Sequence, residues 1–374
     1  MTTPFAAAFT VGDPATLAQR CLVQLPSAGE GATLGIVYVS EPAATAMPQL
    51  VRDLAAGTGI KSWVGGVGLG VVGGGEEVYD RPAAAVMTMP LPNDSFRLFA
   101  ATDDPAADLP RWHAGWIEKA QPTLALVHAD PRCNDLIRVA TDTANASGAF
   151  LVGGLVSHRC EAPLLAGDAD AFGAAGISGL LLTPEVSVAT ALTQGCIPIG
   201  PVHRIDEARD NVVMAIDGKP ALAVFLDDIG PELASDPRRL GGVIFAGLPV
   251  QGSDMGDYLV RNLMAIDPRQ GWIVLGAEVA PGDPILFCRR DPDSAKADLD
   301  RMLKQLAGRL KGPPKAGIYV SCIARGAALF GEPGIETGLI RERFGDIPLI
   351  GFFANGEISR DRLYGHTGVL TLFT

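Results

Sequence analysis

The chain has 374 residues, 48% of them apolar and 19% charged, which is typical of a folded protein of about two or three domains. Its 30 basic and 42 acidic side chains give a formal net charge of −12. A negative surface repels phosphate backbones and anionic headgroups, so neither nucleic acid nor a membrane is an expected partner. No cationic segment precedes the first apolar residues, and no apolar run is long enough for a bilayer, which predicts a cytoplasmic protein.

The first predicted unit runs from Asp13 to Leu91. An amphipathic helix capped by Asp13 precedes a buried strand, "TLGIVYVS", and a second helix over residues 42–57 follows. The stretch "VGGVGLGVVGGGEE" comes next, and the apolar run "AAAVMTMPL" reads as a last strand.

The glycine stretch contains the pattern G-x-G-x-x-G at Gly68, Gly70 and Gly73. A dinucleotide-binding loop of this pattern needs a helix directly after it, because the helix amino terminus holds the phosphates. Here the chain continues into a strand with no helical periodicity between, so the sequence predicts a strand-to-strand crossing. The glycines are expected either to form a tight bend or to leave room for a ligand.

The same order of elements recurs at near-equal length in Asp104–Pro184 and Asp293–Phe373, with "FLVGGLVS" and "PLIGFFANGEIS" at the place of the glycine stretch. This pattern indicates duplication. We predict an α/β fold of three repeated helix-strand-helix-strand-Gly turn-strand units. Each unit has one helical crossover and one direct link between strands, so the sheets are expected to be mixed.

The segment Glu185–Pro292 has a different texture, with short β runs and the turn dipeptides Asp217-Gly218 and Gly282-Asp283. It predicts a β-hairpin-rich insertion containing two helical pieces, at residues 225–236 and 253–267. A change near residues 205–217 divides the chain into expected domains at 1–210 and 211–374.

Polar residues are densest in the third unit, where five of them stand at or near predicted strand ends: Cys322, Arg325, Glu336, Glu357 and His366. Six cysteines are spread along the chain with no C-x-x-C pair, which argues against zinc ribbons, redox dithiols and disulfide scaffolds. No G-x-S-x-G, Walker lysine, H-E-x-x-H or EF-hand motif occurs, so no known catalytic signature accounts for the cluster.

The stretch from Ser321 to the carboxyl terminus resembles the FIST C-terminal domain, through "SCIARGAALFG", "GFFANGEI" and "TGVLTLF". The amino-terminal half, with "GIVYVS" and the "VGG…GGGEE" turn, resembles the FIST N-terminal domain. The resemblance implies a sensory protein that binds a small ligand, for which amino acids have been proposed. Some members bind haem and sense nitric oxide. No kinase, cyclase or chemoreceptor segment remains after the units are assigned, so any output is expected to pass to a separate partner protein.

Arg325 matches the arginine of the family and is expected to hold a ligand carboxylate, since its guanidinium offers a planar pair of donors. The alternative is a structural arginine paired with Glu336 or Glu357. Glu357 follows the third glycine turn, as Glu76 and Glu77 follow the first, and could meet a ligand ammonium. The alternative is a solvated turn acid.

The predicted ligand site is completed by a thiol and by glycines of the first and third turns: Cys322, Gly351, Gly356, Gly65 and Gly66.

Two other functions are compatible with the sequence. His366 could be the axial ligand of a haem, with His128 and His158 as competing candidates. Cys322 could instead be a nucleophile with His366 as its base, which would make the protein a cysteine-dependent enzyme. The plainer alternatives are a buried thiol and a hydrogen-bonded histidine. A small-ligand sensor with an amino acid-like ligand is the main prediction.

Overall fold

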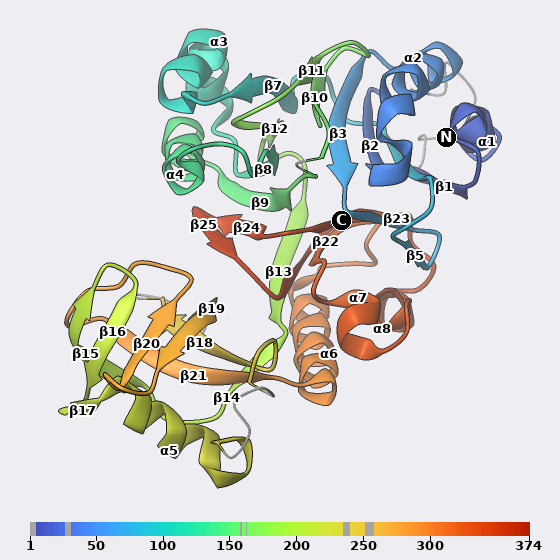
Figure 1. Cartoon of the computed structure of the whole chain (residues 1–374). Helices are drawn as coiled ribbons and strands as arrows, with labels where there is room; N and C mark the ends of the chain where they lie inside the picture. Colours follow the sequence, from blue (N-terminus) through green and yellow to red (C-terminus); the bar gives the residue numbers. More distant parts are fainter. Residues whose placement is uncertain (1–4, 27–30, 158, 162, 235–239, 251–257) are drawn as a thin grey trace. The chain divides into compact units, whose positions relative to one another are not determined.

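The computed structural model describes residues 5–26, 31–157, 159–161, 163–234, 240–250 and 258–374. They form two compact units, whose elements are labelled in Figure 1. The first unit holds Met1–Thr193, Leu299–Leu363 and Thr367–Thr374, and the second holds Gln194–Asp298 and Tyr364–His366. The expected domain boundary after residue 210 stays a prediction, because these units are defined by contacts and interleave along the sequence.

The α/β class with mixed sheets is confirmed by three six-stranded sheets. In each one, a central strand pairs in parallel on one side and antiparallel on the other. The first sheet has the order β1 (Ala6–Val11), β6 (Ala83–Met89), β2 (Leu34–Ser40), β3 (Ser62–Gly68), β10 (Leu164–Gly167), β11 (Phe172–Gly173).

The second and third sheets repeat this pattern of pairing. The second has the order β7 (Phe96–Thr102), β12 (Ile177–Leu182), β8 (Leu124–Ala129), β9 (Phe150–Leu155), β24 (Glu357–Arg360), β25 (Arg362–Tyr364). The third has the order β13 (Val188–Gln194), β26 (Thr367–Phe373), β22 (Ala316–Cys322), β23 (Leu349–Ala354), β4 (Gly70–Gly73), β5 (Glu76–Val78).

The last two strands of every sheet come from a distant part of the chain. The β4–β5 hairpin, which follows the parallel strand β3 of the first sheet, pairs with β23 of the third sheet. Likewise β10 follows β9 but pairs with β3, and β24 follows β23 but pairs with β9. The three sheets are therefore tied together by exchanged strands.

The glycine stretch is the first of these exchanges. The chain passes from β3 through β4 and β5 into β6 without a helix, which confirms the strand-to-strand crossing and excludes a dinucleotide loop of the helix-bearing kind.

The inner faces of the three sheets share one apolar core, to which Ile36, Leu126 and Ile318 of the central strands contribute. Helices cover the outer faces, as the apolar spacing of their sequences predicts. The helices of this unit include α1 (Leu17–Leu22), α2 (Met47–Thr58), α3 (Pro105–Ala120), α4 (Leu136–Ser147), α7 (Gly326–Phe330) and α8 (Ile335–Phe344), with 3-10 turns at Pro14–Thr16 and Glu41–Ala46. Helix α6 (Pro292–Arg309) begins in the second unit and belongs to the first from Leu299 on.

The second unit is built on antiparallel strands that close on themselves, because β21 pairs with both β15 and β18. Helix α5 (Ala221–Ala234) packs its apolar residues against them. The strands are β14 (Cys196–Pro198), β15 (His203–Arg209), β16 (Val212–Ile216), β17 (Lys219–Pro220), β18 (Ile244–Pro249), β19 (Tyr258–Asp267), β20 (Trp272–Leu275) and β21 (Pro284–Arg290).

Three details of the predicted insertion are wrong. Residues 258–267 of the second expected helix form strand β19, paired on both sides, and residues 253–257 lie outside the described part. Its apolar residues fit one helical face, but Tyr258 and Val260 are buried at the alternate spacing of a strand. Strand β13 joins the third sheet, and the strands flanking Gly282-Asp283 do not pair with each other. The Asp217-Gly218 turn does join the paired strands β16 and β17.

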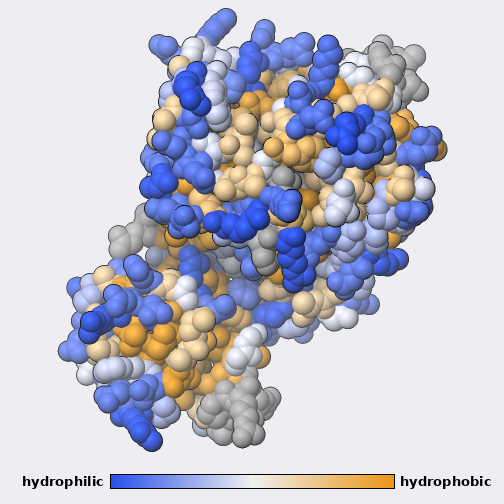
Figure 2. All heavy atoms as spheres, turned by 45° about the horizontal axis from the view of Figure 1, so that its top comes forward, coloured by the Kyte–Doolittle hydropathy of each residue, from blue (hydrophilic) through white to orange (hydrophobic). Residues whose placement is uncertain are grey.

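Hydrophilic side chains are spread over the face drawn in Figure 2, with apolar residues interspersed among them. Among the described residues, every helix is too short or too polar to serve as a membrane span.

Candidate functional site

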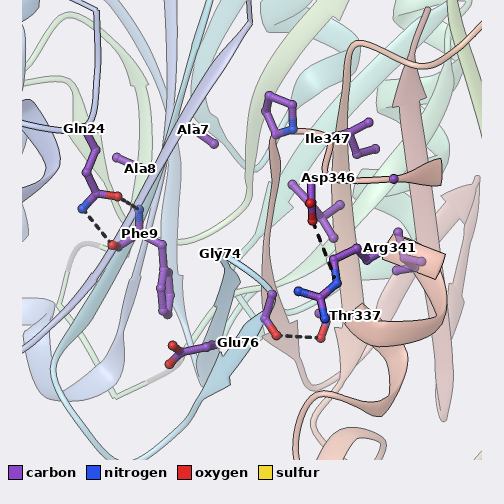
Figure 3. A pocket seen from close by; sticks show the side chains of 15 residues that line it. Ala7, Ala8, Phe9, Gln24, Gly74, Glu76, Thr337, Arg341, Asp346 and Ile347 are labelled. Carbon is purple, nitrogen blue, oxygen red and sulfur yellow. Dashed lines mark hydrogen bonds and ion pairs between the residues drawn. The ribbon is translucent and has the colours of Figure 1, made fainter. Parts of the chain in front are cut away.

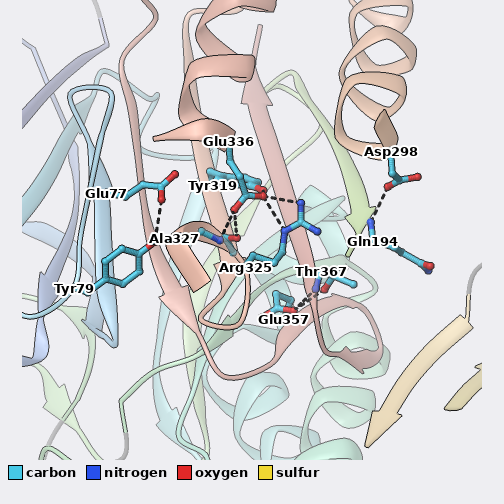
Figure 4. A network of polar contacts seen from close by, with 12 residues as sticks. Glu77, Tyr79, Gln194, Asp298, Tyr319, Arg325, Ala327, Glu336, Glu357 and Thr367 are labelled. Carbon is cyan, nitrogen blue, oxygen red and sulfur yellow. Dashed lines mark hydrogen bonds and ion pairs between the residues drawn. The ribbon is translucent and has the colours of Figure 1, made fainter. Parts of the chain in front are cut away.

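Four of the five polar residues predicted near the strand ends are buried, and two of these, Arg325 and Glu336, form a charged pair. Arg325 precedes α7, and its Nε and Nη2 atoms lie 2.8 and 2.7 Å from Glu336 Oε1 on α8. Both side chains are fully buried. Glu336 also accepts hydrogen bonds from the hydroxyls of Tyr319 and Ser321, at 2.6 and 2.9 Å (Figure 4). The structural alternative for Arg325, pairing with Glu336, is thus present, and its role as a carboxylate anchor stays a prediction.

Glu357 lies at the start of β24 and is 0% exposed, so it is not a solvated turn acid. Its Oε2 atom accepts hydrogen bonds from the backbone N–H and the hydroxyl of Thr367, at 3.1 and 2.6 Å. Its Oε1 atom has no nitrogen or oxygen donor within hydrogen-bond distance among the described residues. A buried carboxyl oxygen without such a partner is costly, and it marks a place where a ligand donor would be stabilised.

The environment of Glu357 favours the protonated acid. Burial raises its pKa to about 8, although the hydrogen bonds from Thr367, the positive charge of Arg325 and a hydrogen bond from Cys322 each lower it. At neutral pH the carboxyl is therefore mostly neutral, and an ammonium or other cation placed against it would draw the proton off.

The three sheets allow a comparison of Glu357 with two other positions. Glu357 pairs with Gly154 of β9 in the second sheet. At the same step of the exchanged strands, Leu164 pairs with Gly66 of the first sheet, and Val71 pairs with Phe352 of the third. Leu164 and Val71 are buried and apolar. The fold therefore accepts an apolar residue at this step, and the acid at 357 needs another explanation.

Cys322 ends strand β22 and is 5% exposed. Its thiol is a hydrogen-bond donor to the Glu357 carboxyl. The central strands of the other two sheets reach Ser40 and Asp130 at the same step, and both of these are also buried. A polar residue at this step is thus common to the three sheets. Nucleophilic catalysis by Cys322 stays a prediction.

The predicted glycines have clear structural reasons. A Cβ atom on Gly65 would lie 1.8 Å from the carbonyl oxygen of Val37, and one on Gly351 would lie 1.7 Å from that of Tyr319. Gly153 makes the same approach in the second sheet. These glycines let the parallel strands approach each other, which is the expected close backbone contact.

The other two predicted glycines meet side chains and backbone of the neighbouring segments. A Cβ on Gly66 would lie 2.7 Å from the carbonyl oxygen of Pro163, and one on Gly356 would lie 2.9 Å from Leu363 Cδ1. None of these contacts tests a ligand role, so the ligand role of the four predicted glycines stays a prediction.

The histidines do not converge on one place. His128 is 0% exposed, its Nε2 atom lies 2.9 Å from the Tyr38 hydroxyl, and burial lowers its pKa to about 3. A haem iron could not reach this ring without rearrangement of the core, so His128 does not fit an axial ligand. His366 belongs to the second unit, where its ring lies 4.4 Å from that of Phe245, and His158 lies outside the described residues. Haem binding thus rests on the resemblance alone.

Three participants in the cluster escape sequence reasoning. Tyr319 and Ser321 lie inside an apolar strand, and Thr367 begins another. Their hydroxyls meet carboxylates that α8 and β24 carry, and this meeting depends on the packing of segments that are separate in the sequence. The signal available in sequence is the alternation "YVSC", in which Tyr319 and Ser321 share one face of the strand.

A pocket of about 450 Å³ lies beside this cluster, at the first glycine turn. It is lined by β1, the turn at Gly74 and Gly75, and α8 with the segment that follows it (Figure 3). Thr337, next to Glu336, lines it and donates a hydrogen bond of 3.2 Å to the carbonyl of Gly75.

Comparison with known proteins covers nearly the whole chain. Residues 33–219 match the family model of the FIST N domain, and residues 221–360 match that of the FIST C domain. The chain is 31% identical over 325 residues to Uncharacterized protein Rv0628c of Mycobacterium tuberculosis, covering 83% of each protein. It is 29% identical over 325 residues to Uncharacterized protein Mb0898c of Mycobacterium bovis, covering 83% of this chain and 82% of that one. F-box only protein 22 of Homo sapiens is 23% identical over 191 residues, which is 50% of this chain and 40% of that protein.

Proposed function

The chain belongs to the FIST family, and from this premise we propose that it is a sensor whose amino acid-like ligand places its ammonium group against Glu357. FIST domains are described as sensory domains that bind small ligands. The observation that carries the finer proposal is the buried Oε1 atom of Glu357, which lacks a nitrogen or oxygen partner among the described residues.

The chemistry of the pair is complementary. A cation that donates to Oε1 would satisfy the open acceptor and would replace the proton that burial keeps on the carboxyl. Thr367 already holds Oε2, so the carboxyl presents Oε1 in a fixed direction. Arg325 supports the exchange, since its charge favours the ionised form of Glu357.

The apolar residues at the matching steps support a binding role. If the acid served only to fill the core, Leu or Val would do so without desolvating a carboxyl, as Leu164 and Val71 do. We infer that the three repeated units, which share one strand order, are copies of one ancestral unit and that the third copy acquired the acid.

The test is native mass spectrometry of the purified full chain beside its Glu357→Leu variant. We expect a non-covalent excess mass of a small amine-bearing molecule in the wild type and its loss in the variant. An equal excess in both would overturn the role of Glu357, and an excess of the mass of haem would replace the proposal with a haem sensor. Glu76→Gln is the matched control, because Glu76 is an exposed acid of the first glycine turn.

A further inference from the structure

The pocket at the first glycine turn has one wall made by the outer edge of β1. Alternate residues of an antiparallel edge strand direct their N–H and C=O groups away from the sheet. The next even-numbered residue, Gly12, donates inward to the Pro82 carbonyl, so the odd-numbered residues of β1 face outward.

Neighbouring outward groups are already occupied by side chains. The Gln24 amide closes Phe9, accepting from its N–H at 3.2 Å and donating to its C=O at 3.0 Å. Arg20 donates to the Val11 carbonyl at 2.7 Å. The outward N–H and C=O of Ala7, which lines the pocket, have no partner among the described residues. The pocket thus offers one donor and one acceptor with the spacing of a β ladder.

The opposite wall supplies charge. Arg341 lines the pocket and is exposed, and its Nε atom lies 3.9 Å from Asp346 Oδ1, at the outer limit of an ion pair. A Cβ atom on Gly75 would lie 3.4 Å from Arg341 Nη1, so the glycine keeps the space beside the guanidinium open. Glu76 and Asp346 add negative charge to the same pocket (Figure 3).

We propose that this pocket binds a free dipeptide, whose amide pairs with Ala7 and whose carboxylate binds Arg341. The acids Glu76 and Asp346 suit the ammonium end of the same molecule. The volume is within the range of small-ligand pockets, about 300–1,000 Å³. This site is separate from Glu357 and does not depend on the function proposed for it.

The test is calorimetric titration of the full chain with alanyl-alanine. Two analogues of this dipeptide serve as comparison ligands. Alanyl-alanine amide lacks the carboxylate, and alanyl-lactate lacks the amide N–H. We expect saturable binding of the dipeptide, with losses of about tenfold or more for each analogue, or about 1.4 kcal/mol. Arg341→Gln should weaken the dipeptide to a similar extent, whereas Arg343→Gln, an exposed arginine of the same helix outside the pocket lining, should not.

Ala7→Pro removes only the outward N–H, which an edge strand tolerates. It should weaken binding by about tenfold, as the loss of the ligand's own N–H does, while circular dichroism remains that of the wild type; if the variant unfolds, the two analogues decide alone. Equal affinity for the dipeptide and its analogues, or no saturable binding of alanyl-alanine, would overturn the proposal. Equal affinity for the N-acetylated dipeptide would overturn it in favour of the carboxyl-terminal tail of a protein.

Discussion

Two regions of the first compact unit occupy matching places in their sheets and differ in one side chain. At the junction of β24 and β9 the buried residue is Glu357, and at the junction of β10 and β3 it is Leu164. Both face a glycine of the parallel strand, Gly154 and Gly66 respectively. The difference teaches that the backbone arrangement does not demand an acid, and that the polar surroundings of Glu357 serve the acid itself.

These surroundings are only partly matched on the other side of the comparison, where Ser40 stands at the step of Cys322. Thr367 and Cys322 donate to Glu357, and the Arg325–Glu336 pair lies close enough to influence its pKa. Leu164 is an apolar residue that is buried at the matching step, opposite Gly66. The third repeated unit therefore surrounds its buried acid with three kinds of supporting group: a hydroxyl, a thiol and a guanidinium.

Removing the charged partner should give the largest effect. Arg325→Met leaves Glu336 buried without its counter-ion, so the free energy of unfolding should fall by about 3–5 kcal/mol. Urea denaturation measures this change. Arg343→Met, which removes an arginine from an exposed ion pair, is the control and should change stability little. A loss equal to that of the control would show that the pair does not hold the cluster.

Replacing the acid by its counterpart should stabilise the protein. Glu357→Leu removes a buried carboxyl whose Oε1 atom lacks a nitrogen or oxygen partner among the described residues, and we expect the free energy of unfolding at pH 8 to rise by about 3 kcal/mol. The reverse change, Leu164→Glu, should destabilise the protein, since that site has no equivalent of Thr367. If Glu357→Leu destabilises the protein at pH 8, the acid is a structural requirement and the comparison fails.

The pH dependence sharpens the same comparison. The pKa of Glu357 is about 8 when folded against 4.5 for the ordinary group, so the folded state keeps a proton that the unfolded state has lost between these values. The contribution of this proton to the free energy of unfolding is complete below pH 4.5. It is lost as the pH rises to about 8, with a slope of about 1.4 kcal/mol per pH unit. Other groups titrate alike in both proteins, so the difference in the free energy of unfolding between the wild type and Glu357→Leu, measured by denaturation, should show this slope across the range. Parallel curves would contradict a raised pKa.

The smallest effect is expected at the exposed acid of the first glycine turn. Glu76→Gln should leave the free energy of unfolding unchanged within error, because the side chain is solvated. Its neighbour Glu77 is buried and accepts a hydrogen bond from the Tyr79 hydroxyl at 2.9 Å, so Glu77→Gln should have the larger effect of the two. If Glu76→Gln and Glu77→Gln change the melting temperature equally, the burial of an acid does not determine the effect of its substitution.

Many elements of the first compact unit could be predicted from the sequence, because each is marked by the spacing of its own residues. Helix α2 follows apolar spacing and ends at Gly59 in the left-handed conformation, and the buried strands are near-continuous apolar runs. The exchange of strands between sheets could not be predicted, because it depends on contacts between distant segments. Strand β19 was missed for the same reason, since pairing on both sides overrides its helical spacing.

Four residues of the buried cluster could be predicted from the sequence, but their arrangement could not. Charge and the glycine turn pointed to Arg325 and Glu357, yet burial decides their chemistry, and burial arises from packing. The sequence leaves the pairing of Arg325 with Glu336 as one of two alternatives. The burial of the Glu357 Oε1 atom cannot be predicted from the sequence, because it depends on the packing of distant segments.

The most direct measurement is titration of the wild type and of Glu357→Gln with the free amino acids and their N-acetyl forms, at pH 6 and pH 8. The account predicts an amino acid that binds the wild type more tightly at pH 8 with release of a proton, and that loses affinity when its amine is acetylated or Glu357 is replaced. Equal affinity of the two proteins for every amino acid that binds would contradict it.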